Sequence, residues 1–269
     1  MVLRSPAAIA SLLFALAPAV LGAQGRQTER AFTLNERIPA GQWLRVRNVI
    51  GEVRVRPGTG DRVEVVATKS WRRGDPSTVR IESRKSSDGS ILVCAFWSQN
   101  ATCSEDGYRS RNDDRDRHHD RNNDVNVDFE VRLPKGVHVG AWSVNGEVSV
   151  DGATGEVEAG SVNGSVDATS SGGPVQASSV NGTVHARMGR VGSNEDLDFS
   201  SVNGNVIAEF GEDIDAQIEL STVNGRFQTD WPVTITGRVD PRHLRATIGK
   251  GGRRIRLSTV NGNVELRKR

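Results

Sequence analysis

The sequence predicts an all-β protein built from stacked repeats. Three observations support this fold class: the composition favours strands and turns, a short motif recurs at nearly constant spacing, and apolar and polar residues alternate around it. The 269 residues are 36% hydrophobic and include 29 glycines, with many valines, serines, threonines and asparagines. This mixture is typical of strands and tight turns, whereas a helical bundle would be rich in Leu, Ala, Glu and Lys.

The first residues have the features of an export signal. Arg4 precedes an apolar run over residues 7–21, and Ala23 completes a small-residue cleavage site. The run is too short for a comfortable membrane span, and no cysteine follows it for a lipid anchor. We therefore expect a signal peptide over residues 1–23 and an exported mature protein that is periplasmic, or is extracellular or at the cell surface.

The region after the signal, residues 24–104, is predicted to hold a first β coil and a hairpin. The hairpin strands are expected near residues 78–81 and 91–95, on either side of Ser-Ser-Asp-Gly-Ser. The two cysteines, Cys94 and Cys103, lie nine positions apart. In an oxidising compartment the simplest outcome is one structural disulfide, because a redox or metal pair would be expected nearer Cys-x-x-Cys spacing.

Residues 105–124 form a charged insertion with seven acidic residues, five arginines and almost no apolar ones. Such a segment cannot offset its ordering entropy, so we expect a disordered loop. His118, His119 and Asp120 are the candidate ligands for a transition metal, but no further ligand is fixed near them. A solvated charge run is the favoured interpretation, and the sequence predicts no metal site and no cofactor.

The motif Ser/Thr-Val-Asn-Gly occurs six times, and residues 48–51, Asn-Val-Ile-Gly, form a degenerate early copy. Successive motif asparagines are separated by 18, 18, 22, 21 and 37 residues. The last gap is close to two periods, so we expect one copy to have lost its motif around residues 241–252. A repeat domain is therefore expected over residues 125–269. Its repeat positions are Asn145, Gly146, Asn163, Gly164, Asn181, Gly182, Asn203, Gly204, Asn224, Gly225, Asn261 and Gly262.

Asn-Gly between apolar residues usually marks a two-residue hairpin, but the alternation here argues against one. In one uninterrupted strand, Val144, Gly146 and Val148 fall on the same face, whereas a hairpin would mix apolar and polar residues on each face. Just before the motif, the apolar residues shift by one position, from one set of alternate positions to the other. We therefore expect the strand to run through the motif with its valine inward, and a corner or bulge immediately before it.

Two short strands and two corners in every 18–22 residues describe a parallel β-solenoid, or β-helix. Glycine-rich stretches such as residues 171–174 supply the second corner. Stacking would place equivalent positions about 4.8 Å apart, which predicts a core column of Val, Ala and Leu beside a ladder of asparagines. An antiparallel β meander is the alternative.

The repeated motif, Asn-Val-Ile-Gly-Glu-Val-Arg-Val at residues 48–55 and Thr-Ile-Gly-Lys-Gly-Gly at residues 247–252 resemble a bacterial family. It is the putative-adhesin β-strand-repeat domain family, a domain of unknown function. The resemblance covers roughly residues 43–266 and implies a right-handed β-helix-like fold with an envelope or extracellular role. It brings no catalytic residues, and this chain departs from the pattern mainly by its charged insertion.

Charge is distributed unevenly, although the formal net charge is only +2, which argues against a strongly basic nucleic-acid binder. Residues 125–237 carry 5 basic and 16 acidic groups, whereas residues 238–269 carry 10 and 2. In that last segment, Arg253, Arg254 and Arg256 form the candidate surface for an anionic envelope polymer or another envelope protein. The alternative is that these arginines protect the open edge of a last coil that has no further neighbour.

No Gly-x-Ser-x-Gly, His-Glu-x-x-His or phosphate-binding Gly-Lys-Ser/Thr motif occurs. We therefore expect an exported, non-catalytic β-solenoid that acts as an envelope-associated, adhesin-like binding or structural module. Some β-helices are enzymes that act on anionic polysaccharide, and such an enzyme is the alternative. Aromatic residues are only 5%, and Trp43, flanked by Arg45 and Arg47, is the one candidate platform for a sugar ring.

Overall fold

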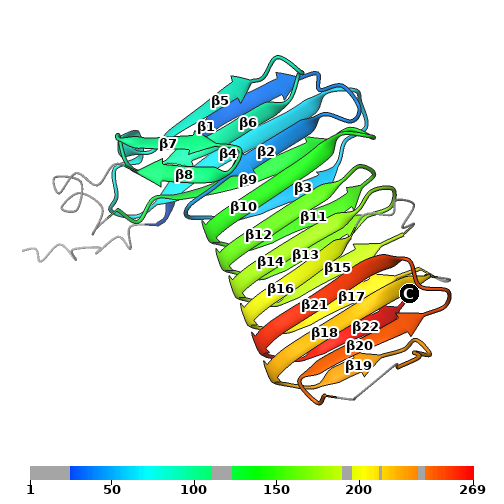
Figure 1. The fold of residues 1–269 in the computed structure, drawn as a ribbon. Coiled ribbons are helices and arrows are strands. Elements are labelled where there is room, and N and C mark those ends of the chain that lie inside the picture. The colour runs from blue at the N-terminus through cyan, green and yellow to red at the C-terminus, as the bar shows by residue number, and fades with distance from the viewer. Residues whose placement is uncertain (1–24, 111–122, 190–195, 212–213, 236–239) are drawn as a thin grey trace, which may run out of the picture.

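The computed structural model describes residues 25–110, 123–189, 196–211, 214–235 and 240–269. Two ten-stranded sheets, sheet A and sheet B, stack their strands along one long axis and enclose a common hydrophobic core (Figure 1). Both sheets mix parallel and antiparallel pairs, and neither closes on itself. Among the described residues the helical content is one short 3-10 turn, η1 (Pro76–Thr78). The protein is therefore all-β, as the composition predicts.

Sheet A begins with two antiparallel pairs and continues as a parallel sheet. In spatial order its strands are β1 (Gln27–Glu36), β4 (Val63–Trp71), β9 (Asn126–Leu133), β3 (Val53–Pro57), β11 (Val148–Ala153), β13 (Val166–Ser170), β15 (Val184–Met188), β17 (Val206–Phe210), β22 (Val264–Lys268) and β19 (Phe227–Thr229).

Sheet B is parallel except for its two outermost pairs. In spatial order its strands are β20 (His243–Ile248), β18 (Ala216–Asn224), β21 (Arg253–Asn261), β16 (Leu197–Asn203), β14 (Val175–Asn181), β12 (Val157–Asn163), β10 (His138–Asn145), β2 (Trp43–Arg47), β6 (Ile91–Phe96) and β5 (Arg80–Lys85). A separate antiparallel hairpin consists of β7 (Ala101–Ser104) and β8 (Gly107–Ser110).

Each repeat contributes one strand to sheet B and the next strand to sheet A. The chain passes from β10 to β11, then from β12 to β13 and from β14 to β15, and equivalent strands of successive repeats pair in parallel and in register. The repeats therefore do not form the antiparallel meander that was the alternative.

The chain crosses between the sheets at Asn-Gly, so the expectation that one strand runs through the motif is wrong. The motif valines face outward, and those at positions 162, 180, 202, 223 and 260 are 39–50% exposed. The Ser or Thr before each valine is buried instead, because its hydroxyl donates a hydrogen bond of 2.8–2.9 Å to a glycine carbonyl of the adjacent coil. These bonds run from Ser143 to Gly51, Ser161 to Gly146, Ser179 to Gly164, Ser201 to Gly182, Thr259 to Gly204 and Thr222 to Gly262.

The motif asparagines form a ladder along this corner, in which each side-chain amide donates to the next side-chain oxygen at 2.7–2.8 Å. The donors and acceptors are Asn163 to Asn145, Asn181 to Asn163, Asn203 to Asn181, Asn261 to Asn203 and Asn224 to Asn261. The glycine that follows has no space for a side chain. A Cβ added to Gly182 would lie 2.1 Å from the carbonyl oxygen of Gly164, which only a backbone shift could relieve.

The last coil in the sequence is not the last coil in space. Strand β21 lies between β16 and β18, and β22 lies between β17 and β19, so both strands have neighbours on each side (Figure 1). Residues 243–248, where a degenerate coil was expected, instead form β20, which pairs antiparallel with β18 and ends sheet B. The expectation that the final coil exposes an open edge is therefore wrong.

The N-terminal part adds further strands to the same stack. Strands β5 and β6 form an antiparallel hairpin, and β2 and β3 form a coil beside the first complete repeat. Residues 107–110, inside the segment expected to be disordered, form strand β8. The predicted signal peptide and His118, His119 and Asp120 lie outside the described residues.

Candidate functional site

The outward side chains of sheet B form straight rows across the strands, because the repeats pair in parallel and in register. The serine row consists of Gly160, Ser178, Ser200, Ser258 and Ser221. The valine row consists of Val162, Val180, Val202, Val260 and Val223. The charged row consists of Glu158, Gln176, Asp198, Arg256 and Glu219.

The alternation that fills the core also creates these rows. In β14, Ala177 and Ser179 are buried. Gln176, Ser178 and Val180 alternate with them and are exposed. A row of exposed valines differs from the scattered apolar residues found on most surfaces, and contiguous exposed apolar side chains often mark a binding face.

Trp142, on β10, stands at one end of the serine row. Its indole lies over Gly140 and Gly160: a Cβ on Gly140 would come within 2.3 Å of the ring, and one on Gly160 within 2.7 Å. The guanidinium carbon of Arg47 lies 3.6 Å from the ring centroid, within cation–π range. Two glycines and one arginine therefore fix the position of this half-buried tryptophan.

Arg47 is held by the β7–β8 hairpin. Its Nη2 donates to the carbonyl of Glu105, and the hydroxyl of Tyr108 lies 2.6 Å from the Arg47 carbonyl oxygen. Burial lowers the pKa of Arg47, and the nearby carboxylate of Glu158 opposes that shift. Burial also raises the pKa of the Tyr108 hydroxyl, which therefore stays protonated as a donor.

A hollow of about 490 Å³ lies on the outer face of sheet B beside Trp142. Its polar lining residues are Glu158, Gln176, Ser178, Asp198 and Ser200, and Ala159 and Ala177 complete it with Trp142. Carboxylate and amide oxygens accept hydrogen bonds, while hydroxyls and the amide nitrogen also donate. An aromatic ring beside several such groups can bind a ligand that has both apolar faces and hydroxyls, which is the chemistry of a sugar ring.

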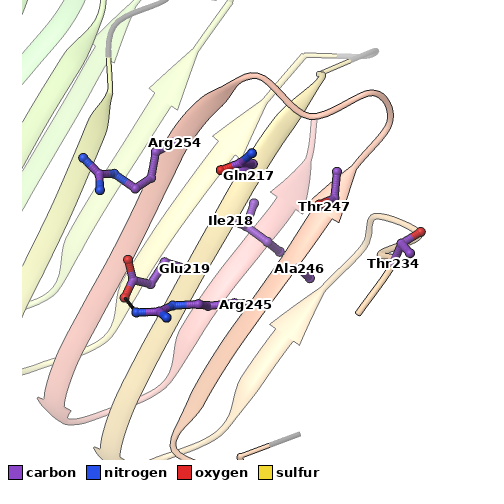
Figure 2. Close-up of a pocket in the computed structure, with 8 residues that line it drawn as sticks. All are labelled: Gln217, Ile218, Glu219, Thr234, Arg245, Ala246, Thr247 and Arg254. Atoms are coloured by element: carbon purple, nitrogen blue, oxygen red, sulfur yellow. Dashed lines mark hydrogen bonds and ion pairs between the residues drawn. The ribbon is translucent and has the colours of Figure 1, made fainter. Parts of the chain in front are cut away.

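A second hollow, of about 320 Å³, lies on the same face farther along the stack. Figure 2 shows Gln217 and Glu219 on β18, with Arg245 and Thr247 on the neighbouring β20. The carboxylate of Glu219 lies 3.3 Å from Arg245 Nη2 and 3.3 Å from a ring nitrogen of His243. This hollow therefore contains charges that already neutralise one another.

The three arginines predicted as an anionic-partner surface lie on β21, within the stack. Arg253 is half-buried, and Arg254 pairs with Asp196 through its side chain and its backbone N–H. Arg256 is exposed and lies in register between Asp198 of β16 and Glu219 of β18. Carboxylates therefore flank Arg254 and Arg256, and the three arginines do not form a uniformly basic stripe.

Cys94 and Cys103 form the predicted disulfide. Trp43, the platform suggested by the sequence, lies near His138, with ring centroids 5.1 Å apart, and the guanidinium carbon of Arg45 lies 4.2 Å from the Trp43 ring. Among the described residues, no three His, Cys, Asp or Glu side chains gather as metal ligands. Nor does that part of the chain contain a helix long and apolar enough to cross a membrane.

Sequence reasoning missed Trp142 and the serine row. The signal was present: the alternation of Val139, Ala141 and Ser143 places Trp142 outward if the motif serine is accepted as an inward residue. Gly140 lies two residues before Trp142 on the same strand, and Gly160 lies in register with Trp142 on the neighbouring strand.

A scan of protein-family models and a search of curated proteins found no match to this chain. A solved structure of a putative cell adhesion protein from Clostridium sporogenes ATCC 15579 aligns over 91% of this chain and 99% of its own, with 8% identity and a TM-score of 0.48. A putative adhesin from Bacteroides fragilis NCTC 9343 aligns over the same shares, with 11% identity and a TM-score of 0.26. Both carry the adhesin description that the sequence resemblance implies, but likenesses this distant carry no functional argument, and family membership stays a prediction.

Proposed function

We propose that this chain is an exported, non-catalytic, adhesin-like binding module, and that it binds a linear glycan lying across the strands of sheet B. The observation that carries the proposal is the set of in-register rows that runs from the Trp142 hollow along the outer face of sheet B. The disulfide supports an oxidising compartment outside the cytoplasm. Parallel coils stacked in register also support the proposal that the repeats form a right-handed β-solenoid.

The spacing of the rows suits a polymer better than a small molecule. Strands in a sheet are about 4.8 Å apart, so the serine row extends roughly 19 Å from Gly160 on β12 to Ser221 on β18. A chain of repeated sugar units can make the same contact at successive strands. Hydroxyls and carboxylates would bind its hydroxyl groups, while the valine row would pack against its C–H faces.

The charges of the hollow favour a neutral or amine-bearing glycan. Glu158 and Asp198 both line it, and they would repel uronate groups. The anionic polymers expected from the sequence would instead have to bind near Arg253, Arg254 and Arg256, where carboxylates already compete for the guanidinium groups of Arg254 and Arg256.

The test is retention on insoluble chitin, cellulose, deacetylated chitin and cross-linked polygalacturonate, compared with a Ser200→Arg variant. An arginine in the middle of the serine row blocks the face but points into solvent, so the fold should persist. Ser165→Arg is the matched control, because the equivalent position of another coil is already Arg226. We expect retention on a neutral or amine-bearing polymer that Ser200→Arg abolishes and Ser165→Arg preserves. Absence of retention on all four polymers, or equal loss in both variants, would contradict the proposal.

Two carboxylates facing one hollow are also the residue types that glycoside hydrolysis requires, which favours the enzyme alternative. Glu158 and Asp198 stand on strands separated by β14. Incubation with soluble oligomers of the retained polymer separates the two functions. Binding without product release supports the module, and products lost in both Glu158→Gln and Asp198→Asn would establish the enzyme.

A further inference from the structure

The β7–β8 hairpin has its own small core on the outer side of sheet B. Leu92, Cys94 and Phe96 of β6 pack with Cys103 in a cluster separate from the main core, and the ring of Tyr108 meets Phe96 edge-on with centroids 5.9 Å apart. An isolated two-stranded hairpin is only marginally stable. The Cys94–Cys103 disulfide is therefore a principal restraint on the position of this hairpin.

The hairpin contacts the backbone and the side chain of Arg47. The single hydroxyl proton of Tyr108 is shared between the carbonyl oxygens of Arg47 and Ala95, at 2.6 and 2.7 Å. The Glu105 carbonyl accepts from Arg47 Nη2, while the Glu105 carboxylate lies 3.5 Å from Arg45. Arg47 thereby receives its orientation from residues of the hairpin turn and of β8.

Arg47 connects the hairpin to the hollow through its contact with Trp142. Its guanidinium covers the ring of Trp142, and the Nε of Arg47 is buried without a hydrogen-bond partner among the described residues. Sheet B therefore does not satisfy all the hydrogen-bond donors of this guanidinium. The Trp142 ring and the Glu105 carbonyl are the contacts that hold it. Trp142 in turn lines the hollow beside Glu158.

We infer that Arg47 is a positioning residue and that the Cys94–Cys103 disulfide completes the binding hollow by holding the hairpin, and through it Arg47, against Trp142. The part of this inference that concerns ligand affinity rests on the proposed function. Reduction by a dithiol breaks the S–S bond and forms two thiols, while the dithiol is oxidised to its own disulfide. A chain with reduced cysteines therefore has an incomplete hollow, and the site matures once an oxidising compartment is reached.

The first test reads Trp142 directly and needs no ligand. The indole N–H resonances of the five tryptophans are compared in oxidised protein and after dithiothreitol treatment, with Trp142→Phe used for assignment. Trp231 is the internal control. Like Trp142 it has a cation beside its ring, with Lys268 Nζ 5.3 Å from the ring centroid, but it lies far along the stack of strands from the hairpin. We expect the Trp142 resonance to shift and the Trp231 resonance to stay. An unchanged Trp142 resonance with both thiols titrated as free would overturn the inference.

Two variants separate positioning from a general loss of structure. Tyr108→Phe keeps the disulfide but removes the hydrogen bond to the Arg47 carbonyl, so it should shift the Trp142 resonance in the same direction. Thr102→Val removes a hydrogen bond within the hairpin, from Thr102 to the Arg109 carbonyl, and should leave that resonance in place. Equal shifts in both variants would show that Trp142 reports hairpin stability in general, which would overturn the role of Arg47.

The second test reads affinity on chitin and cellulose columns. Reduction and Arg47→Gln should each weaken retention by about threefold or more, the loss expected for one cation–π contact. The two losses of retention should not add when reduction and Arg47→Gln are combined, because both changes act through the same contact. Retention that is unaffected by reduction while the Trp142 resonance shifts would overturn the link to binding. If the oxidised protein is not retained at all, the proposed function fails, while the resonance test still decides the structural coupling.

Discussion

The outer faces of the two sheets share one repeat and one register but use their outward positions differently. On sheet A, Arg187 donates to both carboxylate oxygens of Asp167 at 2.9 and 3.0 Å, and a ring nitrogen of His185 lies 2.8 Å from Glu209. Arg267 extends the cluster across β22, with Nη1 lying 4.0 Å from Glu209. The charges of this face are therefore largely used for contacts between coils.

On sheet B, two of the three outward rows hold mainly serines and valines, with Trp142 and a hollow at one end of the rows. The repeat therefore fixes where side chains point, whereas the outward residue types decide whether a face is occupied by its own contacts or open to a ligand. The acidic excess of residues 125–237 is partly neutralised on sheet A, so it does not by itself predict a charged binding face.

The largest effect is expected at the corner that both faces share. Gly182→Val should destabilise the protein by about 3 kcal/mol or more, because the new side chain meets the Gly164 carbonyl oxygen. Thr183→Lys, one residue later and half-exposed, should stay within about 0.5 kcal/mol of the parent. Urea unfolding measures both, and equal losses would show that the corner is not limited by the close backbone approach.

A substitution on each face separates stability from binding. Glu209→Gln removes a partner of His185, Arg187 and Arg267, so it should cost about 1 kcal/mol and leave polymer retention unchanged. Asp198→Asn on sheet B should change stability by less than about 0.5 kcal/mol but alter retention. Paired unfolding and column measurements test this contrast, which would collapse if Glu209→Gln altered retention and Asp198→Asn did not.

The smallest effect concerns whether Arg254 is available to an anion. The Arg254 side chain and backbone N–H lower the pKa of Asp196. A carboxyl group whose pKa is lowered by folding stabilises the folded protein at pH values above the pKa of the unfolded state, near 3.9. This stabilisation is lost as the pH falls through the pKa of the folded state. Arg254→Gln should therefore raise the pKa of Asp196 toward its ordinary value in a carboxyl-carbon NMR titration. An unchanged Asp196 titration would mean that Arg254 is free to bind polymers.

The sequence predicts the all-β class and the disulfide, and both are present. It also predicts an asparagine ladder, because a motif repeated every 18–22 residues stacks like on like, and the asparagines do lie in one. The inward side of the motif was misassigned because hydrophobicity favours Val180 over Ser179. The hydrogen bond that lets Ser179 be buried depends on the carbonyl of Gly164, in another coil.

The order in which the coils stack could not be predicted from the sequence. Every coil carries the same motif, and its asparagine can form the same hydrogen bonds with the asparagine of any other coil. Asn261 bonds to Asn203 on one side and Asn224 on the other. The β7–β8 hairpin was missed for a different reason: its polar sequence has little apolar content, and Tyr108 packs against residues of another strand, β6, among them Cys94 and Phe96. The candidate site lies next to this hairpin, because the guanidinium of Arg47 both donates to the Glu105 carbonyl and covers the ring of Trp142.

Hydroxyl-radical footprinting, with and without the polymer that retains the protein, tests most directly whether sheet B is the binding face. We predict protection of Trp142, Val180 and Val202 on sheet B and unchanged reactivity of His185 on sheet A. Protection of His185, or no protection at Trp142 and the two valines, would show that sheet B is not the binding face.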